Sequence, residues 1–236
     1  MFETSSALSG AIQVVDHGGE RRLVAGGDTL SIIPLSGDWS ALRGAYWWRA
    51  LDGASLTPRP TALFVGAGGG SQLHLLHARA RPRSVTVVER DPVILQVAQR
   101  YFRLDQLPRA EFLCGAIEDV LPWLESSRRR FAFIMEDAAY WAHPDQALPI
   151  VRRLAGLVAP RGTLVLNRHA RHHAVETAAA LRPAFARVTV RRMGGAGGNA
   201  LICATDPRRP PPASATVPRS YPVTARRKRS TSPSSL

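Results

Sequence analysis

Two adjacent carboxylates stand where an apolar run of the sequence ends. Glu136 and Asp137 close the stretch FAFIMED, residues 131–137, and the aromatic residues Tyr140 and Trp141 follow shortly after. In open α/β sheets ligands bind at the carboxyl ends of the strands, so paired acids at such an end indicate a site. An acid there can orient an acceptor group or remove its proton. Because successive side chains of a strand point to opposite faces, we expect only one of the two acids to face the ligand.

A second group of residues has the spacing of a nucleoside site. The stretch LFVGAGGGS ends another apolar run and contains Gly66, Gly68, Gly69 and Gly70. Glycines let the chain turn tightly and present backbone N–H groups at the start of a helix. Glu89 ends the next apolar run, 23 residues after Gly66, where an acid can accept hydrogen bonds from ribose hydroxyls. We therefore expect a nucleoside to bind between the glycine loop and Glu89.

A parallel sheet would bring these residues to one edge, and the chain has the pattern of such a sheet. From residue 61 onward, short apolar runs alternate with helical stretches. Strands are predicted at 61–66, 84–89, 110–115, 131–137, 162–167, 185–192 and 199–205, and helices at 71–80, 91–102, 117–126, 144–158 and 174–183. Strand–helix alternation with short links predicts a doubly wound α/β sheet.

The end of this pattern distinguishes two kinds of nucleoside-binding fold. The stretch MGGAGG, residues 193–198, joins the last two strands and is too short for a crossover, so these strands should form an antiparallel hairpin. Ser71 occupies the position of the third glycine in a dinucleotide motif. Both features favour a seven-stranded class I methyltransferase-type (Rossmann-like) sheet over a dinucleotide dehydrogenase. The expected donor substrate is S-adenosylmethionine, with no metal.

The chain divides into three predicted parts. Residues 1–57 indicate a small N-terminal β-cap of two or three antiparallel strands, followed by a linking helix, and residues 58–206 form the nucleoside-binding domain. Residues 207–236 hold seven Arg or Lys and no acid, together with many Pro and Ser residues, so we expect a disordered basic tail. Such a tail could contact nucleic acid, although a solvated, solubilising role is the simpler interpretation.

The composition limits the location and the metal chemistry of the protein. Of its 236 residues 45% are hydrophobic, but no run approaches the ~20 apolar residues of a membrane span. The N-terminus lacks the features of a secretion signal, and Cys114 and Cys203 are interpreted as reduced core residues, so we expect a cytoplasmic protein. His169 and His173 have helical spacing without a carboxylate or cysteine beside them, which favours a surface cluster over a metal site.

The sequence resembles the spermidine synthase (polyamine aminopropyltransferase) family of the class I methyltransferase superfamily over roughly residues 5–205. The β-cap and the stretches LFVGAGGG, VTVVERDPVILQVAQRYF, FLCGAIEDVLPWL and FAFIMEDAAYW carry the resemblance. In that family, decarboxylated S-adenosylmethionine donates an aminopropyl group to an amine. The resemblance implies that Glu89 holds the ribose, that Asp91 and Ala116 lie at the donor site, and that Asp137 occupies the position of the amine-activating Asp. It also implies a homodimer.

Four polar positions of that family have changed here. Gly69 stands in place of an Asp of the glycine loop, Trp47 and Trp48 replace a polar pair after Tyr46, Ala116 replaces the adenine-recognising Asp, and Tyr140 replaces a second Asp. A polyamine is a multiple cation whose burial requires several carboxylates, so we expect a different small-molecule acceptor, with an amine as one candidate. Tyr46, Trp47, Tyr140 and Trp141 would line an aromatic acceptor pocket, or would simply pack the cap against the main domain.

Two other functions fit the same residues. Asp137 and Tyr140 have the spacing of the Asp–Pro–Pro–Tyr motif of nucleic-acid amino-methyltransferases, although both prolines are absent. The loss of four polar site positions is also typical of a catalytically inactive protein of the same fold that binds a ligand or serves as a scaffold. The sequence therefore predicts a transferase with an altered acceptor site and leaves these two alternatives open.

Overall fold

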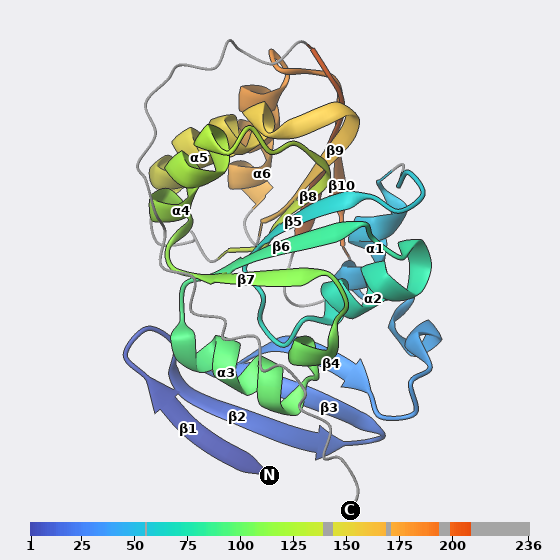
Figure 1. The fold of residues 1–236 in the computed structure, drawn as a ribbon, viewed down its shortest axis with the longest axis vertical. Coiled ribbons are helices and arrows are strands. Elements are labelled where there is room, and N and C mark those ends of the chain that lie inside the picture. Colours follow the sequence, from blue (N-terminus) through green and yellow to red (C-terminus); the bar gives the residue numbers. More distant parts are fainter. Residues whose placement is uncertain (55, 139–143, 169–170, 194–198, 209–236) are drawn as a thin grey trace, which may run out of the picture.

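The computed structural model of the chain describes residues 1–54, 56–138, 144–168, 171–193 and 199–208. Figure 1 shows two sheets, a small one at the N-terminus and a larger one flanked by helices. The predicted domain boundary, between residues 57 and 58, falls between the last strand of the small sheet and the first strand of the large one. The division into domains remains a prediction. The predicted tail lies outside the described residues beyond residue 208.

The N-terminal sheet has four antiparallel strands, in the order β1 (Phe2–Ser6), β2 (Gly10–His17), β3 (Glu20–Ala25) and β4 (Asp28–Pro34). Its inward side chains, among them Ile12, Val14 and Leu23, form a core with residues of helix α3 (Pro92–Tyr101). The prediction of two or three strands was thus one or two strands too few. The segment FETSS has little apolar content, and it forms a strand because it pairs along β2, with Phe2 opposite Val14.

The larger sheet has seven strands in the order β10-β11-β9-β8-β5-β6-β7. Their bounds are β5 (Thr61–Val65), β6 (Ser84–Glu89), β7 (Ala110–Cys114), β8 (Phe131–Glu136), β9 (Val158–Arg168), β10 (Phe185–Arg192) and β11 (Ala200–Pro207). β5 to β9 pair in parallel, and β11 pairs antiparallel with both β9 and β10. The predicted class I sheet with its terminal hairpin is therefore confirmed.

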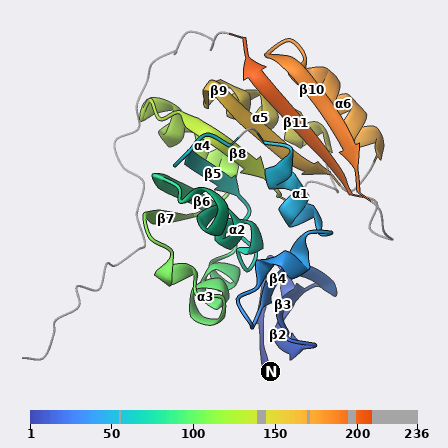
Figure 2. The ribbon, with the colours of Figure 1, turned by 90° about the vertical axis from the view of Figure 1, so that its right-hand side faces the viewer.

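Helices cover both faces of this sheet, as Figure 2 shows from the side. Their bounds are α1 (Tyr46–Asp52), α2 (Ser71–Ala80), α4 (Ile117–Ser126), α5 (Pro144–Gly156) and α6 (Arg171–Leu181), with short 3₁₀ turns η1 (Trp39–Leu42) and η2 (Leu104–Gln106). One buried cluster packs α4, α5 and α6 on one face. A second cluster packs α1, α2 and part of α3 on the other. The sheet is thus the middle of three layers, and its carboxyl edge lies beside the N-terminal sheet.

Several element boundaries differ from the sequence prediction, and the largest differences have physical reasons. The predicted linking helix is split into η1 and α1, because the segment around Gly44 turns between them. α5 ends at Gly156, and β9 begins at Val158, four residues before the predicted start at 162. The pairing of β9 with β8 shifts in register between Phe131 and Phe133, and this shift accommodates the additional residues of β9. α6 begins at Arg171 rather than 174.

Three expected absences can be compared with the described part of the chain. Within it, every helix is too short or too polar to cross a membrane. The same residues contain no group of three or more His, Cys, Asp and Glu side chains that could hold a metal ion, while His169 of the predicted surface cluster is outside them. Cys114 and Cys203 are not joined by a disulfide.

Candidate functional site

The glycine loop after β5 lies against the segment that follows β8. Gly66, Gly68 and Gly70 have positive φ angles of 88°, 49° and 81°, a conformation that glycine adopts without steric cost. A Cβ atom added to Gly66 would lie 2.7 Å from the backbone oxygen of Asp137, so only glycine permits this approach. The backbone N–H of Asp137 donates to the carbonyl of Val65 at 2.8 Å. The fold therefore brings the predicted donor loop and the predicted acceptor residue into direct contact.

The N-terminal sheet is attached to the same loop. The backbone N–H of Gly69 donates to the hydroxyl of Ser31 in β4 at 2.7 Å. The hydroxyl of Ser71 accepts from the backbone N–H of Ile32 at 2.8 Å and donates to its carbonyl at 2.7 Å. A Cβ atom at position 69 would lie 2.9 Å from Cδ1 of Phe102, so the loop is packed on both sides. Ser71 thus replaces the expected third glycine because its hydroxyl binds the sheet edge.

Glu89, at the end of β6, is 8% exposed. Its Oε2 accepts from the backbone N–H of Ala67 at 2.9 Å, and its Oε1 accepts from that of Asp91 at 2.9 Å. Burial raises the pKa of the Glu89 carboxyl, and these backbone donors partly oppose the rise. The side chain is therefore fixed beside the glycine loop, and each oxygen retains a lone pair that a hydroxyl group could use.

Asp91 forms the N-cap of α3, and Pro92 follows it at the first helical position. Its Oδ1 accepts from the backbone N–H groups of Val93 at 2.9 Å and Ile94 at 3.4 Å. Its Oδ2 accepts from the hydroxyls of Ser6 and of Ser9, the latter at 2.6 Å. Burial would raise the pKa of Asp91, but these donors hold it below its usual value. The carboxylate thus joins the first β-hairpin to the main domain, and its role at the donor site remains a prediction.

The side chain of Asp137 is held by donors from two distant elements. Its Oδ2 accepts from the hydroxyl of Tyr46 in α1 at 2.9 Å, and its Oδ1 accepts from Nδ2 of Asn167 at the end of β9 at 2.8 Å. Burial and the negative charge of Asp137 raise the pKa of Tyr46 well above its usual value, so the phenol remains a donor at neutral pH. Asp137 is thus an oriented carboxylate at the carboxyl edge of the sheet.

Glu136 has a different environment from its neighbour, as strand alternation predicts. It is fully buried, and its Oε2 lies 2.5 Å from Nη1 of Arg168 in an ion pair. Its Oε1 accepts from the backbone N–H of Ala138 at 3.0 Å. Burial raises the pKa of Glu136, while the Arg168 charge opposes the rise. Glu136 therefore anchors the segment that carries Asp137, which leaves Asp137 as the acid available to a ligand.

Apart from Oε2 of Glu136, which forms the ion pair, three buried polar atoms close to this edge have no hydrogen-bond partner among the described residues. They are Oδ1 of Asn167, Nη2 of Arg168 and Nε2 of Gln72, which is in the first turn of α2. Asn167, Arg168 and Gln72 are 3%, 7% and 6% exposed, respectively. Unpaired buried polar groups are costly in a folded protein, so these atoms are positions where a polar ligand would bind favourably.

The remaining predicted site residues occupy varied positions. Trp47 is 7% exposed and belongs to the core under α1, and its ring lies 4.7 Å from that of Tyr46 between centroids. Ala116 is the N-cap residue of α4, directly after β7. Tyr140 and Trp141 lie outside the described residues. The roles of these four residues in donor or acceptor binding remain predictions.

Sequence reasoning did not identify Ser31, Asn167 or Arg168. The available signal for the last two was the pair of polar residues that ends the apolar run LVL, at the same sheet edge as Glu136 and Asp137. Ser31 had no such signal, because its contact with the glycine loop joins residues 38 positions apart.

Comparison with known proteins identifies relatives of part of the chain, and no family model matches it. A segment of 158 residues is 29% identical to the eEF1A lysine and N-terminal methyltransferase homolog of Drosophila melanogaster, and 28% identical to that of Drosophila pseudoobscura pseudoobscura. Each match covers 61% of this chain. The chain spans about a quarter of these curated relatives, since the match covers 23% of their length.

Solved structures share the architecture at low sequence identity. A probable spermidine synthase from Corynebacterium glutamicum has a TM-score of 0.68 and 19% identity, with 87% of this chain and 80% of that chain covered. Human methyltransferase-like protein 13, in complex with SAH, has a TM-score of 0.53 and 24% identity, with 71% and 86% covered. Together with the strand order and the terminal hairpin, these likenesses show that the chain has the class I S-adenosylmethionine-dependent methyltransferase fold.

Proposed function

We propose that this protein is an S-adenosylmethionine-dependent methyltransferase that acts on a nitrogen acceptor held at Asp137. The observation that carries the proposal is the carboxylate of Asp137, which Tyr46 and Asn167 orient and whose own backbone lies against the glycine loop. The donor would bind along the carboxyl edge, between the glycine loop and Glu89.

The donor site fits a nucleoside with hydroxyl groups and an anionic end. Glu89 is fixed by backbone donors and has lone pairs directed to hydroxyls such as those of ribose. The N-cap of α2 is Gly70, which offers no side-chain acceptor, so the positive end of this helix is open to an anion.

These features favour S-adenosylmethionine over its decarboxylated form. The two donors differ in the α-carboxylate, which the start of α2 would attract. Both donors carry an ammonium group, and residues 66–72 contain no side-chain carboxylate that would repel the additional α-carboxylate of S-adenosylmethionine. Gly69 has no room for a larger side chain without displacing Ser31 or Phe102. The loss of the family's loop Asp therefore changes the charge that the donor site prefers.

The acceptor site fits an amine or amide nitrogen. Asp137 can accept a hydrogen bond from such a group, and the unpaired Oδ1 of Asn167 beside it supplies a second acceptor. When bound, S-adenosylmethionine supplies an electrophilic methyl group on sulfur. The acceptor nitrogen would form the bond to that methyl carbon as the carbon–sulfur bond breaks, and its proton would pass to Asp137 or to water. Tyr46 and Asn167 hold the carboxylate in position for this step.

The curated relatives support a nitrogen acceptor. Their name describes methylation of lysine and of a protein N-terminus, both of which are amines. Because this chain spans only a part of those proteins, we extend to it the methylation of an amine but not their protein substrate. The class of acceptor proposed here is an accessible amine.

Aminopropyl transfer is the second candidate, because the likeness to spermidine synthases covers 87% of the chain. Calorimetric titration separates the two candidates. We expect S-adenosylmethionine to bind more tightly than its decarboxylated form, and the reverse order would favour aminopropyl transfer. If neither donor nor methylthioadenosine binds, the protein is a non-enzymatic member of the fold.

Two variants test the residue assignments. Glu89→Gln should weaken donor binding by roughly 10-fold or more, since one hydrogen bond to a charged group contributes about 1.5–3 kcal/mol. Glu111→Gln is the matched control, because Glu111 pairs with Arg129 away from the carboxyl edge. Asp137→Asn should keep donor binding and abolish transfer of a radiolabelled methyl group to an amine panel. Unchanged transfer by Asp137→Asn would refute its catalytic role.

A further inference from the structure

The opposite edge of the large sheet, where the parallel strands begin, carries a row of exposed arginines. Arg59 precedes β5, Arg81 and Arg83 precede β6, and Arg109 precedes β7. Backbone hydrogen bonds hold them side by side: the N–H of Arg59 donates to Ala80 at 3.2 Å, that of Arg83 donates to Pro60 at 2.9 Å, and the carbonyl of Arg109 accepts from Val85 at 2.9 Å.

The row continues across the neighbouring strands. Arg128 lies before β8, and Arg161 lies in the first part of β9, where the register shifts. Strands in a sheet are about 4.8 Å apart, so the row over β9, β8, β5, β6 and β7 spans roughly 19 Å. We call these six exposed residues, Arg59, Arg81, Arg83, Arg109, Arg128 and Arg161, the arginine row.

The backbone of the row is unusual. Five of its members have positive φ, at 53° for Arg59, 46° for Arg81, 60° for Arg109, 54° for Arg128 and 62° for Arg161. Glycine or asparagine adopts this conformation at lower cost, so a long cationic side chain at five such positions is not the choice that stability alone favours. Arg103, outside the row, has the same conformation, so what distinguishes the row is that five such arginines lie along one edge.

Nearby acids do not neutralise the row. Asp52 pairs with Arg79 at 2.8 Å, Glu125 pairs with Arg153 at 2.8 Å, and Glu111 pairs with Arg129. In the described part of the chain, each of these acids is thus paired with an arginine outside the row, and no member of the row forms an ion pair. Six guanidinium groups therefore remain available to an external anion.

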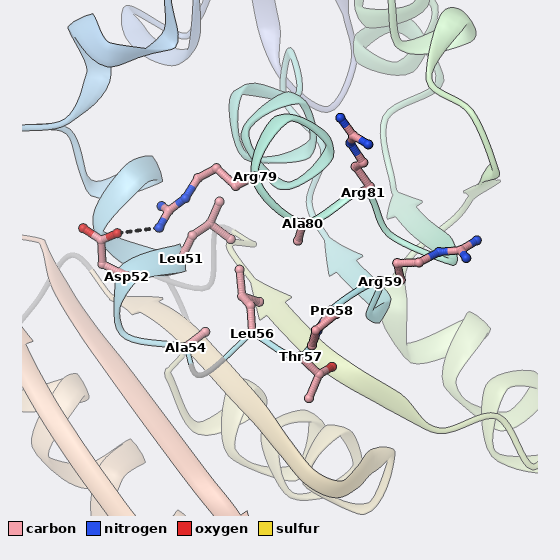
Figure 3. A pocket seen from close by; sticks show the side chains of 10 residues that line it. All are labelled: Leu51, Asp52, Ala54, Leu56, Thr57, Pro58, Arg59, Arg79, Ala80 and Arg81. Carbon is pink, nitrogen blue, oxygen red and sulfur yellow. Dashed lines mark hydrogen bonds and ion pairs between the residues drawn. The ribbon is translucent and has the colours of Figure 1, made fainter.

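A hollow of about 570 Å³ opens at the β5 and β6 part of the row. Its apolar lining includes Leu51, Leu56 and Ala80, and its polar lining includes Arg59 and Arg81. Figure 3 shows Arg79 reaching toward Asp52, whereas Arg59 and Arg81 extend away from that pair. A hollow with both apolar and polar walls, beside cations that are free of ion pairs within the described residues, suits a ligand that combines flat ring groups with an anionic backbone.

We propose that the arginine row binds single-stranded nucleic acid, with phosphates on the guanidinium groups and an unstacked base in the hollow. Guanidinium groups pair with phosphate through two parallel hydrogen bonds, and a spaced row of cations follows a backbone of repeated charges. A single strand fits better than a duplex, because only its bases are free to enter the hollow. This surface lies on the edge opposite Asp137, so the nucleic acid is an anchor and not the acceptor. The proposal does not depend on the proposed methyl transfer.

The test measures fluorescence anisotropy of a labelled single-stranded RNA with the full chain, over roughly 50 to 200 mM salt. The variant R59N/R81N/R109N removes three charges, and asparagine tolerates the positive φ of these positions, so the fold should be kept. Each lost phosphate contact lowers the slope of log affinity against log salt by about 0.7 for a single strand, which predicts binding ~100-fold weaker near 0.1 M salt. Melting temperatures at or above wild type verify folding.

The matched control is R100Q/R103N/R192Q. It removes three exposed charges from α3, the residue before η2, and the end of β10, and Arg103 also has positive φ, at 57°. This control should bind RNA within a few-fold of wild type. Equal weakening in both variants, or none in either, would overturn the proposal and assign any binding to the tail or to net charge. Tighter binding of duplex DNA, or of polyglutamate at equal charge, would also overturn it.

Discussion

Replacing Gly66 by alanine should uncouple the two halves of the candidate site. The new Cβ would lie 2.7 Å from the backbone oxygen of Asp137 and 3.1 Å from its carbonyl carbon, and the backbone at this position has φ of +88°. Alanine in the left-handed region costs about 1–2 kcal/mol. Relief of an overpacked contact costs a further ~1–3 kcal/mol, because backbone rather than a flexible side chain must move. We therefore expect Gly66→Ala to lower the free energy of unfolding by about 2–5 kcal/mol.

Gly27 provides a matched control for this experiment. It also has φ of +88°, in the turn between β3 and β4, but an added Cβ would meet nothing within 4 Å. Gly27→Ala should therefore show the backbone cost of about 1–2 kcal/mol without the contact. Urea unfolding gives the free energy of unfolding of both variants, and the difference between the two losses is the cost of the contact with Asp137.

The same pair tests the proposed methyl transfer. A displaced Asp137 backbone should lower methyl transfer by up to roughly 100-fold, since misplacement by about 1 Å has this effect on a reacting group. Gly27→Ala should transfer methyl groups at the wild-type rate once folded. If both variants lose equal stability and equal activity, the contact between the glycine loop and Asp137 has no energetic role and the reasoning fails.

Three further perturbations have expected outcomes. Tyr46→Phe removes a donor to Asp137 and should lower kcat by roughly 10-fold while donor binding stays unchanged, and a loss in donor affinity alone would contradict this role. Arg168→Met leaves Glu136 as a buried carboxylate without its cation and should cost about 3–5 kcal/mol in urea unfolding at pH 7, with much of it recovered by adding Glu136→Gln. Burial lowers the pKa of His77 in the folded protein from 6.5 to about 4. As the pH falls, the imidazole of the unfolded chain is therefore protonated before that of the folded protein. Stability should decrease between these pH values by roughly 1–2 kcal/mol after allowance for partial exposure, and a His77→Gln protein that retains the full decrease would refute this assignment.

Much of the fold follows from local sequence patterns. The bounds of β6, α2, α4 and β10 coincide with the predicted ranges, because each has apolar residues of one period bounded by turn or capping residues. Asp91 could be predicted as an N-cap from its position before Pro92. Where tertiary contacts set the bounds, as in β1 and the first part of β9, the sequence pattern was insufficient.

The candidate site shows the same division. Sequence position predicted that the glycine loop, Glu89 and Asp137 would share the carboxyl edge, since parallel strands end together. The partners of Asp137 were not predictable, because Tyr46 is 91 residues away and Asn167 is 30 residues away in the chain. Of the two adjacent acids, Glu136 forms an ion pair with the buried Arg168, and this pairing leaves Asp137 as the acid available to a ligand.

The sequence by itself determined the order of strands and helices, the terminal hairpin and the edge at which polar residues gather. These features depend on short-range periodicity and chain connectivity, which one sequence contains in full. Only the tertiary structure decided that Gly66 touches Asp137, that Ser31 and Ser71 attach the N-terminal sheet to the glycine loop, and that arginines from separate turns form one row. Each of those features joins residues far apart in the chain, and their proximity is fixed by packing and strand register, which no local pattern records.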